Sequence, residues 1–128
     1  KGNYDENDPL LPVNNYAWSK LGGECAVKMY KNSLIVRLAI SEKPFIHNQA
    51  FANIQSSFIY HDEAAEIIMK LINQKGIINI GGKTQSIYNF AKKTNKKVIS
   101  KNLSKKDKIS IPKNSSMSIK KLKKFLKK

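Results

Sequence analysis

The sequence predicts an α/β fold, and three observations support this class. Helix-like and strand-like apolar patterns alternate along the chain in the order helix, strand, helix, strand, helix. Hydrophobic residues make up 41% of the 128 positions, close to the average of globular proteins, which argues against general disorder. The length suits one domain or part of a larger one.

The chain opens with an expected loop over residues 1–13, in which one glycine and two prolines interrupt regular structure. A helix then starts after Asn14 or Asn15, because either side chain can accept hydrogen bonds from the first helical amides. It should end near Lys31 and Asn32. Its apolar positions predict a mostly buried helix: Tyr16, Leu21, Cys25, Val27 and Met29.

The run from Ser33 to Ile40 predicts a buried strand, because its apolar residues are nearly continuous. Residues 41–57 follow no regular pattern, and residues 57–60 predict a short strand.

Asp62 is the expected N-cap of a second helix over residues 63–73, and Gly76 closes it. Residues 77–80 then predict another strand. The apolar face of the second helix should hold Ala64, Ile67, Ile68, Leu71 and Ile72.

A Gly81–Gly82 turn leads into a helix over residues 84–93, with Thr84 or Ser86 as its N-cap. The run from Gly82 to Thr84 resembles the end of a phosphate-binding loop. The first glycine of that motif is missing, so a turn between strand and helix is the better interpretation.

The end of the chain is looser and strongly basic. A short strand is expected at residues 108–111, and Ser118 should cap a last helix over residues 119–126. Residues 1–82 carry 8 basic and 8 acidic side chains, whereas residues 83–128 carry 16 basic and 1 acidic, a net charge of +15. A binding module for nucleic acid or anionic surfaces is therefore one alternative. We do not expect nucleic acid as a partner, because the region lacks arginine and an aromatic platform.

Several other classes of site find little support. The single cysteine, Cys25, excludes an internal disulfide and a cysteine-based zinc site, and it should pack on its helix. Residues 61–63 (His-Asp-Glu) are sequential and cannot converge on one metal ion, so no metal is expected. The longest apolar stretch, residues 33–40, is too short to span a membrane, and no signal peptide is recognisable. We expect a cytoplasmic protein.

Tyr16 and Lys20 carry the chemically informative motif, since a spacing of four residues places both on one face of a helix. A nearby ammonium favours the phenolate, which helps the phenol exchange a proton with a carbonyl or alcohol oxygen. A second pair with this spacing, Tyr88 and Lys92, shows that the bare motif is weak. The first pair differs because it opens an apolar helix that precedes a buried strand.

The run NYAWSKLGGE at residues 15–24, followed by LIVRL at residues 34–38, resembles the catalytic helix and next strand of the extended short-chain dehydrogenases/reductases. Among them it is most similar to the dTDP-4-dehydrorhamnose reductase group. Further stretches resemble that group in the same order along the chain: residues 1–9, 76–81, 86–91 and 112–122.

The resemblance implies the C-terminal part of a Rossmann-like reductase that lacks the N-terminal dinucleotide-binding half, because no glycine-rich dinucleotide turn occurs. The chain also begins without Met in a polar stretch, so we expect a fragment, inactive by itself. Residues 1–40 would supply the catalytic helix and strand of the Rossmann-like domain. Residues 41–128 would be mainly a substrate-binding region with a basic C-terminal segment.

The implied activity is NAD(P)H-dependent reduction of a keto group on a nucleotide-linked deoxysugar, with NADP or NAD as cofactor. By this resemblance Tyr16 would donate the proton, and Lys20 would favour the phenolate and bind the nicotinamide ribose. Lys43, Phe45 and His47 would border the nucleotide-sugar substrate. An epimerase or dehydratase of the same superfamily would use the same pair, and a homodimer stays open as the assembly.

Overall fold

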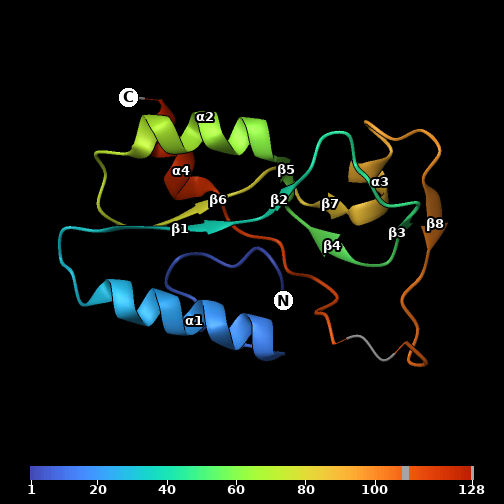
Figure 1. Cartoon of the computed structure of the whole chain (residues 1–128), viewed down its shortest axis with the longest axis horizontal. Helices are drawn as coiled ribbons and strands as arrows, with labels where there is room; N and C mark the ends of the chain where they lie inside the picture. Colours follow the sequence, from blue (N-terminus) through green and yellow to red (C-terminus); the bar gives the residue numbers. More distant parts are fainter. Residues whose placement is uncertain (108–109, 128) are drawn as a thin grey trace.

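The computed structural model describes residues 1–107 and 110–127, in which helices and strands alternate along the chain (Figure 1). The predicted α/β class is therefore confirmed. The helices are α1 (Asn15–Lys28), α2 (His61–Leu71), α3 (Ile87–Ala91) and α4 (Lys120–Leu126). The strands are β1 (Leu34–Leu38), β2 (Ile40–Ser41), β3 (Gln49–Phe51), β4 (Gln55–Ser56), β5 (Ile59–Tyr60), β6 (Gly76–Ile80), β7 (Gln85–Ser86) and β8 (Ile99–Lys101).

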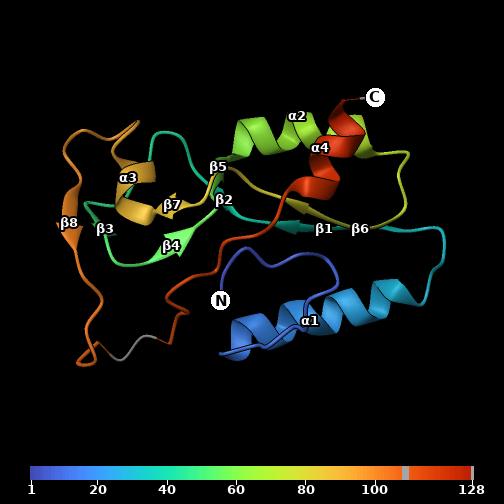
Figure 2. The same cartoon turned by 180° about the vertical axis from the view of Figure 1, so that it is seen from behind.

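The main core lies on a parallel pair of strands. β1 and β6 pair from Leu34 opposite Gly76 to Leu38 opposite Ile80. Helices α2 and α4 lie on one side of this pair and α1 on the other, as both views show (Figures 1 and 2). The buried apolar side chains gather on the α2 and α4 side: Ile59, Ala64, Leu71, Ile78, Ile80 and Leu122.

A second, smaller core lies at the other end of the molecule, where β3 pairs in parallel with β8 and α3 packs beside them. Its buried members are Phe45, Ala50, Ala91 and Val98. The predicted division at residue 40 stays a prediction. The pairing of β1 with β6 nevertheless shows that residues on both sides of that boundary share one sheet.

Helix α1 is far more exposed than the sequence predicts. None of its residues is buried, and the side chains of Tyr16 and Trp18 are 71% and 60% exposed. Cys25 is exposed as well, so its predicted packing is wrong. The reason is that α1 packs mainly against β1, and no second layer covers its outer side among the described residues. Strand β1 is half-buried for the same reason. Among the described residues it pairs with β6 on one edge and with no strand on the other.

The helix caps follow the sequence only in part. The Asn14 side chain accepts a hydrogen bond from the Ala17 amide at 2.8 Å and caps α1, as predicted. Asp62 does not cap α2, because the helix begins at His61, two residues earlier than predicted, and Asp62 already lies in its first turn. The Ser86 hydroxyl caps α3 by accepting from the Asn89 amide at 3.1 Å.

The last third of the chain departs most from prediction. Helix α3 is shorter than predicted, and β8 was not predicted. Ser118 does not cap α4, because Ile119 is the N-cap and the Ser118 amide donates to the Tyr4 carbonyl at 2.7 Å. Of the strand predicted at residues 108–111, positions 108 and 109 lie outside the described residues, and positions 110 and 111 do not belong to a strand.

The remaining elements lie near their predicted places. The irregular stretch 41–57 holds three short strands, and the residues before Asp62 form β5. Ile72 is 61% exposed and does not belong to the apolar face of α2. At Gly81 the chain passes so close to residue 57 that a Cβ would lie 2.7 Å from the Ser57 carbonyl oxygen. No helix among the described residues combines the length and apolarity that crossing a bilayer requires.

Candidate active site

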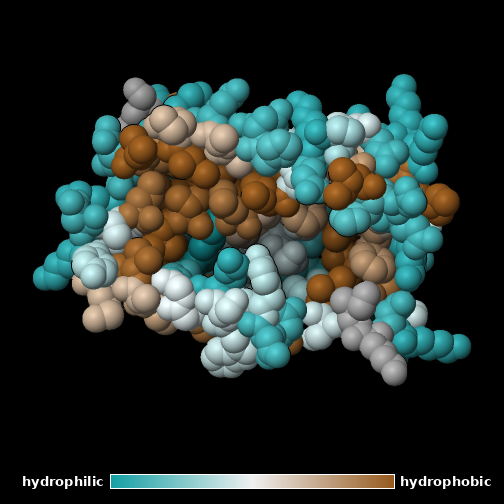
Figure 3. Space-filling view, viewed as in Figure 1, coloured by the Kyte–Doolittle hydropathy of each residue, from teal (hydrophilic) through white to brown (hydrophobic). Residues whose placement is uncertain are grey.

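Helix α1, strand β1 and the N-terminal loop enclose an open cleft of about 820 Å³, here called the α1–β1 cleft. Its helical wall includes Tyr16 and Lys20, and residues 10–12 of the loop form another part of its wall. The whole of β1 and Ile40 also line the cleft. In the view of Figure 1, apolar surface gathers where β1 runs between α1 and α2 (Figure 3). The cleft is therefore a mainly apolar groove that contains a phenol and an ammonium.

The Tyr16 and Lys20 side chains lie together on α1, with the Lys20 Nζ 5.3 Å from the centre of the Tyr16 ring. Tyr88 and Lys92 have almost the same geometry, at 5.5 Å. The local geometry therefore does not separate the two pairs. Their surroundings do, because Tyr16 and Lys20 line the α1–β1 cleft, whereas Tyr88 and Lys92 do not.

A second hollow of about 570 Å³, here called the aromatic cavity, lies beside the first. Phe45 and His47 both line it, and their rings meet edge to face with centres 5.4 Å apart. Ile40 lines the cleft and the cavity alike, so the two hollows adjoin. The structure thus brings two of the three predicted substrate-binding residues next to the cleft that holds Tyr16 and Lys20.

Lys43 lies elsewhere, at the start of α2. Its Nζ donates to the Asp62 carboxylate at 3.0 Å and lies 5.6 Å from the centre of the Tyr60 ring. The hydrogen bond from Lys43 lowers the pKa of Asp62 below its usual value. Lys43 is not among the residues that line the aromatic cavity, so its contact with substrate stays a prediction.

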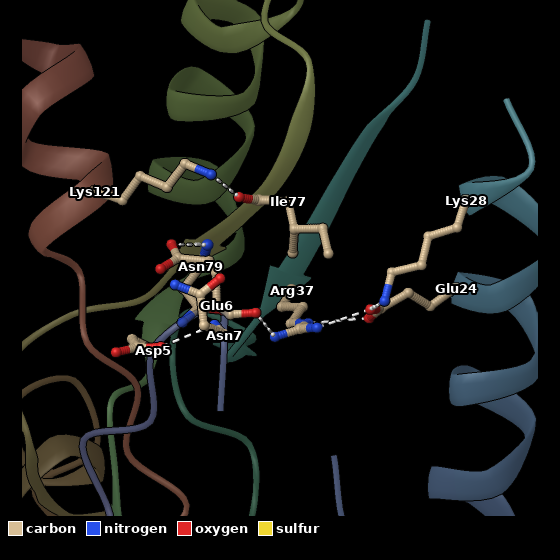
Figure 4. A network of polar contacts seen from close by, with 9 residues as sticks. All are labelled: Asp5, Glu6, Asn7, Glu24, Lys28, Arg37, Ile77, Asn79 and Lys121. Atoms are coloured by element: carbon tan, nitrogen blue, oxygen red, sulfur yellow. Dashed lines mark hydrogen bonds and ion pairs between the residues drawn. The ribbon is translucent and has the colours of Figure 1, made fainter. Parts of the chain in front are cut away.

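A polar network that the sequence did not reveal joins α1, β1 and the N-terminal loop (Figure 4). The Arg37 guanidinium donates from Nε and Nη2 to the Glu24 carboxylate, at 3.0 and 2.7 Å, and from Nη1 to the Glu6 carbonyl oxygen at 3.2 Å. The hydrogen bond from Arg37 holds the pKa of Glu24 below its usual value. Glu6 in turn accepts from the Asn79 amide of β6 at 3.0 Å.

The described residues contain no group of three or more His, Cys, Asp or Glu side chains that could hold a metal ion. Tyr16 and Lys20 are exposed acid–base groups on the lining of the α1–β1 cleft.

No protein-family model and no curated protein matches the sequence. Solved structures do. A hypothetical dTDP-4-dehydrorhamnose reductase from Sulfolobus tokodaii is 27% identical, with a TM-score of 0.78 over 97% of this chain and 52% of that chain. The dTDP-4-dehydrorhamnose reductase from Bacillus anthracis, solved in complex with NADP, is 25% identical, with a TM-score of 0.77 over 94% of this chain and 51% of that chain. The chain has the fold of an extended short-chain dehydrogenase/reductase.

A further match shares this fold at lower identity. UDP-glucuronic acid 4-epimerase from Bacillus cereus, solved in complex with NAD, is 22% identical, with a TM-score of 0.70 over 99% of this chain and 51% of that chain. The predicted resemblance to dTDP-4-dehydrorhamnose reductases is confirmed, and the chain spans about half the length of the reductases it matches.

Within this reductase-like fold, sequence reasoning missed the network around Arg37. One signal was available, because Arg37 is the single arginine of the chain and interrupts an otherwise apolar strand. A charged residue in such a strand needs a partner when it is partly buried. The partner Glu24 lies one helical turn beyond Lys20, on the same face of α1.

Proposed function

We propose that this chain supplies the catalytic helix and the substrate-binding half of an NAD(P)H-dependent reductase that acts on a keto group of a nucleotide-linked deoxysugar. One observation carries the proposal: Tyr16 and Lys20 line the same open cleft, in a fold that matches dTDP-4-dehydrorhamnose reductases. In this reading residues 1–40 act as the catalytic helix and strand, and residues 41–128 mainly bind substrate.

The exposed phenol and ammonium fit the reacting end of a nicotinamide cofactor. Both side chains reach open space in the α1–β1 cleft, and neither donates to a protein acceptor among the described residues. NADP or NAD, when bound, supplies the hydride for reduction. The chain carries no glycine-rich turn for the pyrophosphate, so that end of the cofactor requires a dinucleotide-binding half.

Tyr16 acts as the general acid in this proposal. As the keto carbon is reduced, its oxygen develops negative charge, and the Tyr16 hydroxyl donates its proton to that oxygen. The Lys20 ammonium stabilises the phenolate that remains, because opposite charges attract strongly where water is scarce. Lys20 also provides donors for the ribose hydroxyls of the cofactor.

The aromatic cavity is the proposed substrate region. Phe45 presents a buried aromatic wall, and His47 offers a ring that can donate or accept a hydrogen bond. Because the cavity shares Ile40 with the α1–β1 cleft, one end of a substrate held there would reach toward Tyr16. Lys43, at the start of α2, is proposed as a further contact for the anionic part of the nucleotide sugar.

The proposal is tested by following NADPH oxidation with a nucleotide-linked 4-keto-deoxysugar, using the chain joined to a dinucleotide-binding half. Oxidation that depends on the keto sugar, with one reduced sugar formed per NADPH, would support a reductase. Interconversion of the two C4 alcohol epimers of the nucleotide sugar in the presence of NAD, without net formation of NADH, would instead assign an epimerase, because an epimerase takes a hydride from its substrate and returns it. Absence of any turnover with a folded protein would reject both activities.

A further inference from the structure

The single arginine of the chain lies between α1 and the N-terminal loop, both of which contribute residues to the lining of the α1–β1 cleft (Figure 4). Arg37 stands on β1, and its side chain is only 16% exposed. Two of its nitrogens bind the Glu24 carboxylate of α1, and the third binds the Glu6 carbonyl oxygen of the N-terminal loop. One guanidinium therefore contacts the helical wall and the loop at the same time.

On the helical wall, Arg37 holds the face that presents the proposed catalytic pair. Tyr16, Lys20 and Glu24 follow one another at four-residue spacing, and all three line the cleft. No residue of α1 is buried, so apolar packing by itself restrains the helix weakly. A bidentate pair with a carboxylate restrains orientation as well as distance, because the planar guanidinium accepts one geometry.

On the loop side, the same guanidinium binds the chain shortly before residues 10–12, which line the α1–β1 cleft together with Tyr16. Glu6 is held at two points, since its carbonyl accepts from Arg37 and its carboxylate accepts from the Asn79 amide at 3.0 Å. The Asn79 side chain also donates to the Tyr4 carbonyl at 3.0 Å. The loop is thereby anchored to both strands of the main sheet.

We propose that Arg37 is a positioning residue that couples the N-terminal loop to α1 and so sets the spacing between the walls of the α1–β1 cleft. The proposal rests on the proposed function of Tyr16 and Lys20. Lys28 also pairs with Glu24, at 3.0 Å, but it is exposed and this pair lies within one helix. Exposed ion pairs of that kind contribute little to stability, so Arg37, and not Lys28, is the residue that links the two walls.

The coupling is tested first by amide hydrogen exchange on the 128-residue chain, which requires no turnover. Arg37→Met should accelerate exchange in residues 3–9 and in the second half of α1 by about tenfold or more, the scale of a lost hydrogen bond to a charged group. Amides of α2, which the network does not contact, should keep their protection against exchange. Unchanged exchange in the loop or in α1 would overturn the proposal.

The two contacts of Arg37 are separated by a charge swap, Glu24→Arg together with Arg37→Glu. The swap restores a pair between α1 and β1, but a carboxylate at position 37 cannot donate to the Glu6 carbonyl. Protection should therefore return in α1 and not in the loop, and recovery of both would overturn the proposal.

If the Arg37→Met variant does not fold, Glu24→Gln is used in its place, and exchange in the second half of α1 should again be faster. Asp62→Asn is the matched control, since it breaks a pair outside the cleft and should change neither segment.

The link to catalysis is tested by kinetics on the active reductase that carries this chain. Arg37→Met should lower kcat about tenfold or more with a smaller change in KM, because displaced walls misalign the proton donor more than they weaken binding. Arg37→Lys, which keeps one donor, should recover part of kcat. Equal losses of kcat in Arg37→Met and Arg37→Lys, or a change in KM alone, would overturn the positioning role. A wild-type protein without turnover would reject the proposed function and leave the exchange results to be judged separately.

Discussion

The Lys20 ammonium lies 5.3 Å from the centre of the Tyr16 ring, one helical turn along the exposed face of α1. Tyr88 and Lys92 repeat this relationship at 5.5 Å on the helix that packs into the second core. The two pairs therefore provide a matched comparison within one chain. The pair on α1 borders the α1–β1 cleft, which residues from three segments enclose, whereas Tyr88 and Lys92 are not part of its lining.

In the proposed reductase, replacing Tyr16 with Phe should reduce turnover by at least ~100-fold, the usual scale for a lost general acid. The ring is retained and already exposed, so the unfolding free energy should change little. Turnover is measured by NADPH oxidation at saturating substrate. Tyr88→Phe is the control and should leave turnover nearly unchanged. Equal losses in the two variants would show that the assignment of Tyr16 is wrong.

Replacing Lys20 with Met should lower turnover and also weaken binding of the nicotinamide cofactor. Two roles depend on one ammonium, namely stabilising the Tyr16 phenolate and binding the ribose. Initial rates measured over a range of NADPH concentrations separate the two effects. Lys92→Met should produce neither, and a Lys20→Met variant with normal kinetics would contradict both roles.

The 128-residue chain by itself should not bind NADPH measurably. A dinucleotide needs the amides of a glycine-rich turn and a helix N-terminus for its pyrophosphate, and this sequence contains no such turn. Calorimetric titration of the folded chain with NADPH measures this directly. Tight binding would mean that a phosphate site exists outside the expected motif.

Glu24 should make the stability of the chain depend on acid pH. Its pKa in the folded chain lies below the ordinary value of 4.5, chiefly because Arg37 donates hydrogen bonds to it. The stabilisation is therefore complete above about pH 4.5 and is lost as the pH falls through the lowered folded pKa. Glu24→Gln should cost about 1–2 kcal/mol near neutral pH and reduce this dependence.

Denaturant unfolding at a series of pH values tests the effect of Glu24. Glu66→Gln is the control, because Glu66 is an exposed residue of α2 outside the network. The control should leave the acid dependence of unfolding unchanged. Parallel pH profiles for the wild type and Glu24→Gln would show that the pair with Arg37 does not contribute.

Replacing either of two glycines with alanine should change the stability of the chain, in opposite directions at the two positions. At Gly81 a Cβ would lie 2.7 Å from the Ser57 carbonyl oxygen, so Gly81→Ala should destabilise the chain by about 1–3 kcal/mol. At Gly22, within α1, a Cβ would meet nothing within 4 Å. Gly22→Ala should stabilise the chain by about 0.5–1 kcal/mol, because alanine favours helix. Thermal unfolding of both variants measures the difference, and shifts of the same sign would contradict the packing at Gly81.

The sequence by itself determined the features that depend on neighbours along the chain. Asn14 caps α1 because its side chain reaches an amide three residues ahead, whatever the rest of the molecule does. The run at residues 77–80 forms a strand because its apolar side chains suit a buried sheet. The spacing of Tyr16 and Lys20 likewise places them together on any helix.

The tertiary structure decided what surrounds those elements. The apolar positions of α1 predicted burial, yet exposure depends on which layers cover a helix, and α1 has a layer on one side only among the described residues. Arg37 meets partners 13 and 31 residues away in the sequence, a pairing that no local pattern specifies. Two Tyr/Lys pairs have equal local geometry, and only the assembly of loop, helix and strand places Tyr16 and Lys20 in a cleft. The physical reason is that periodicity records the conformation of a segment, whereas burial, ion pairing and clefts arise from contacts between segments that are distant in sequence.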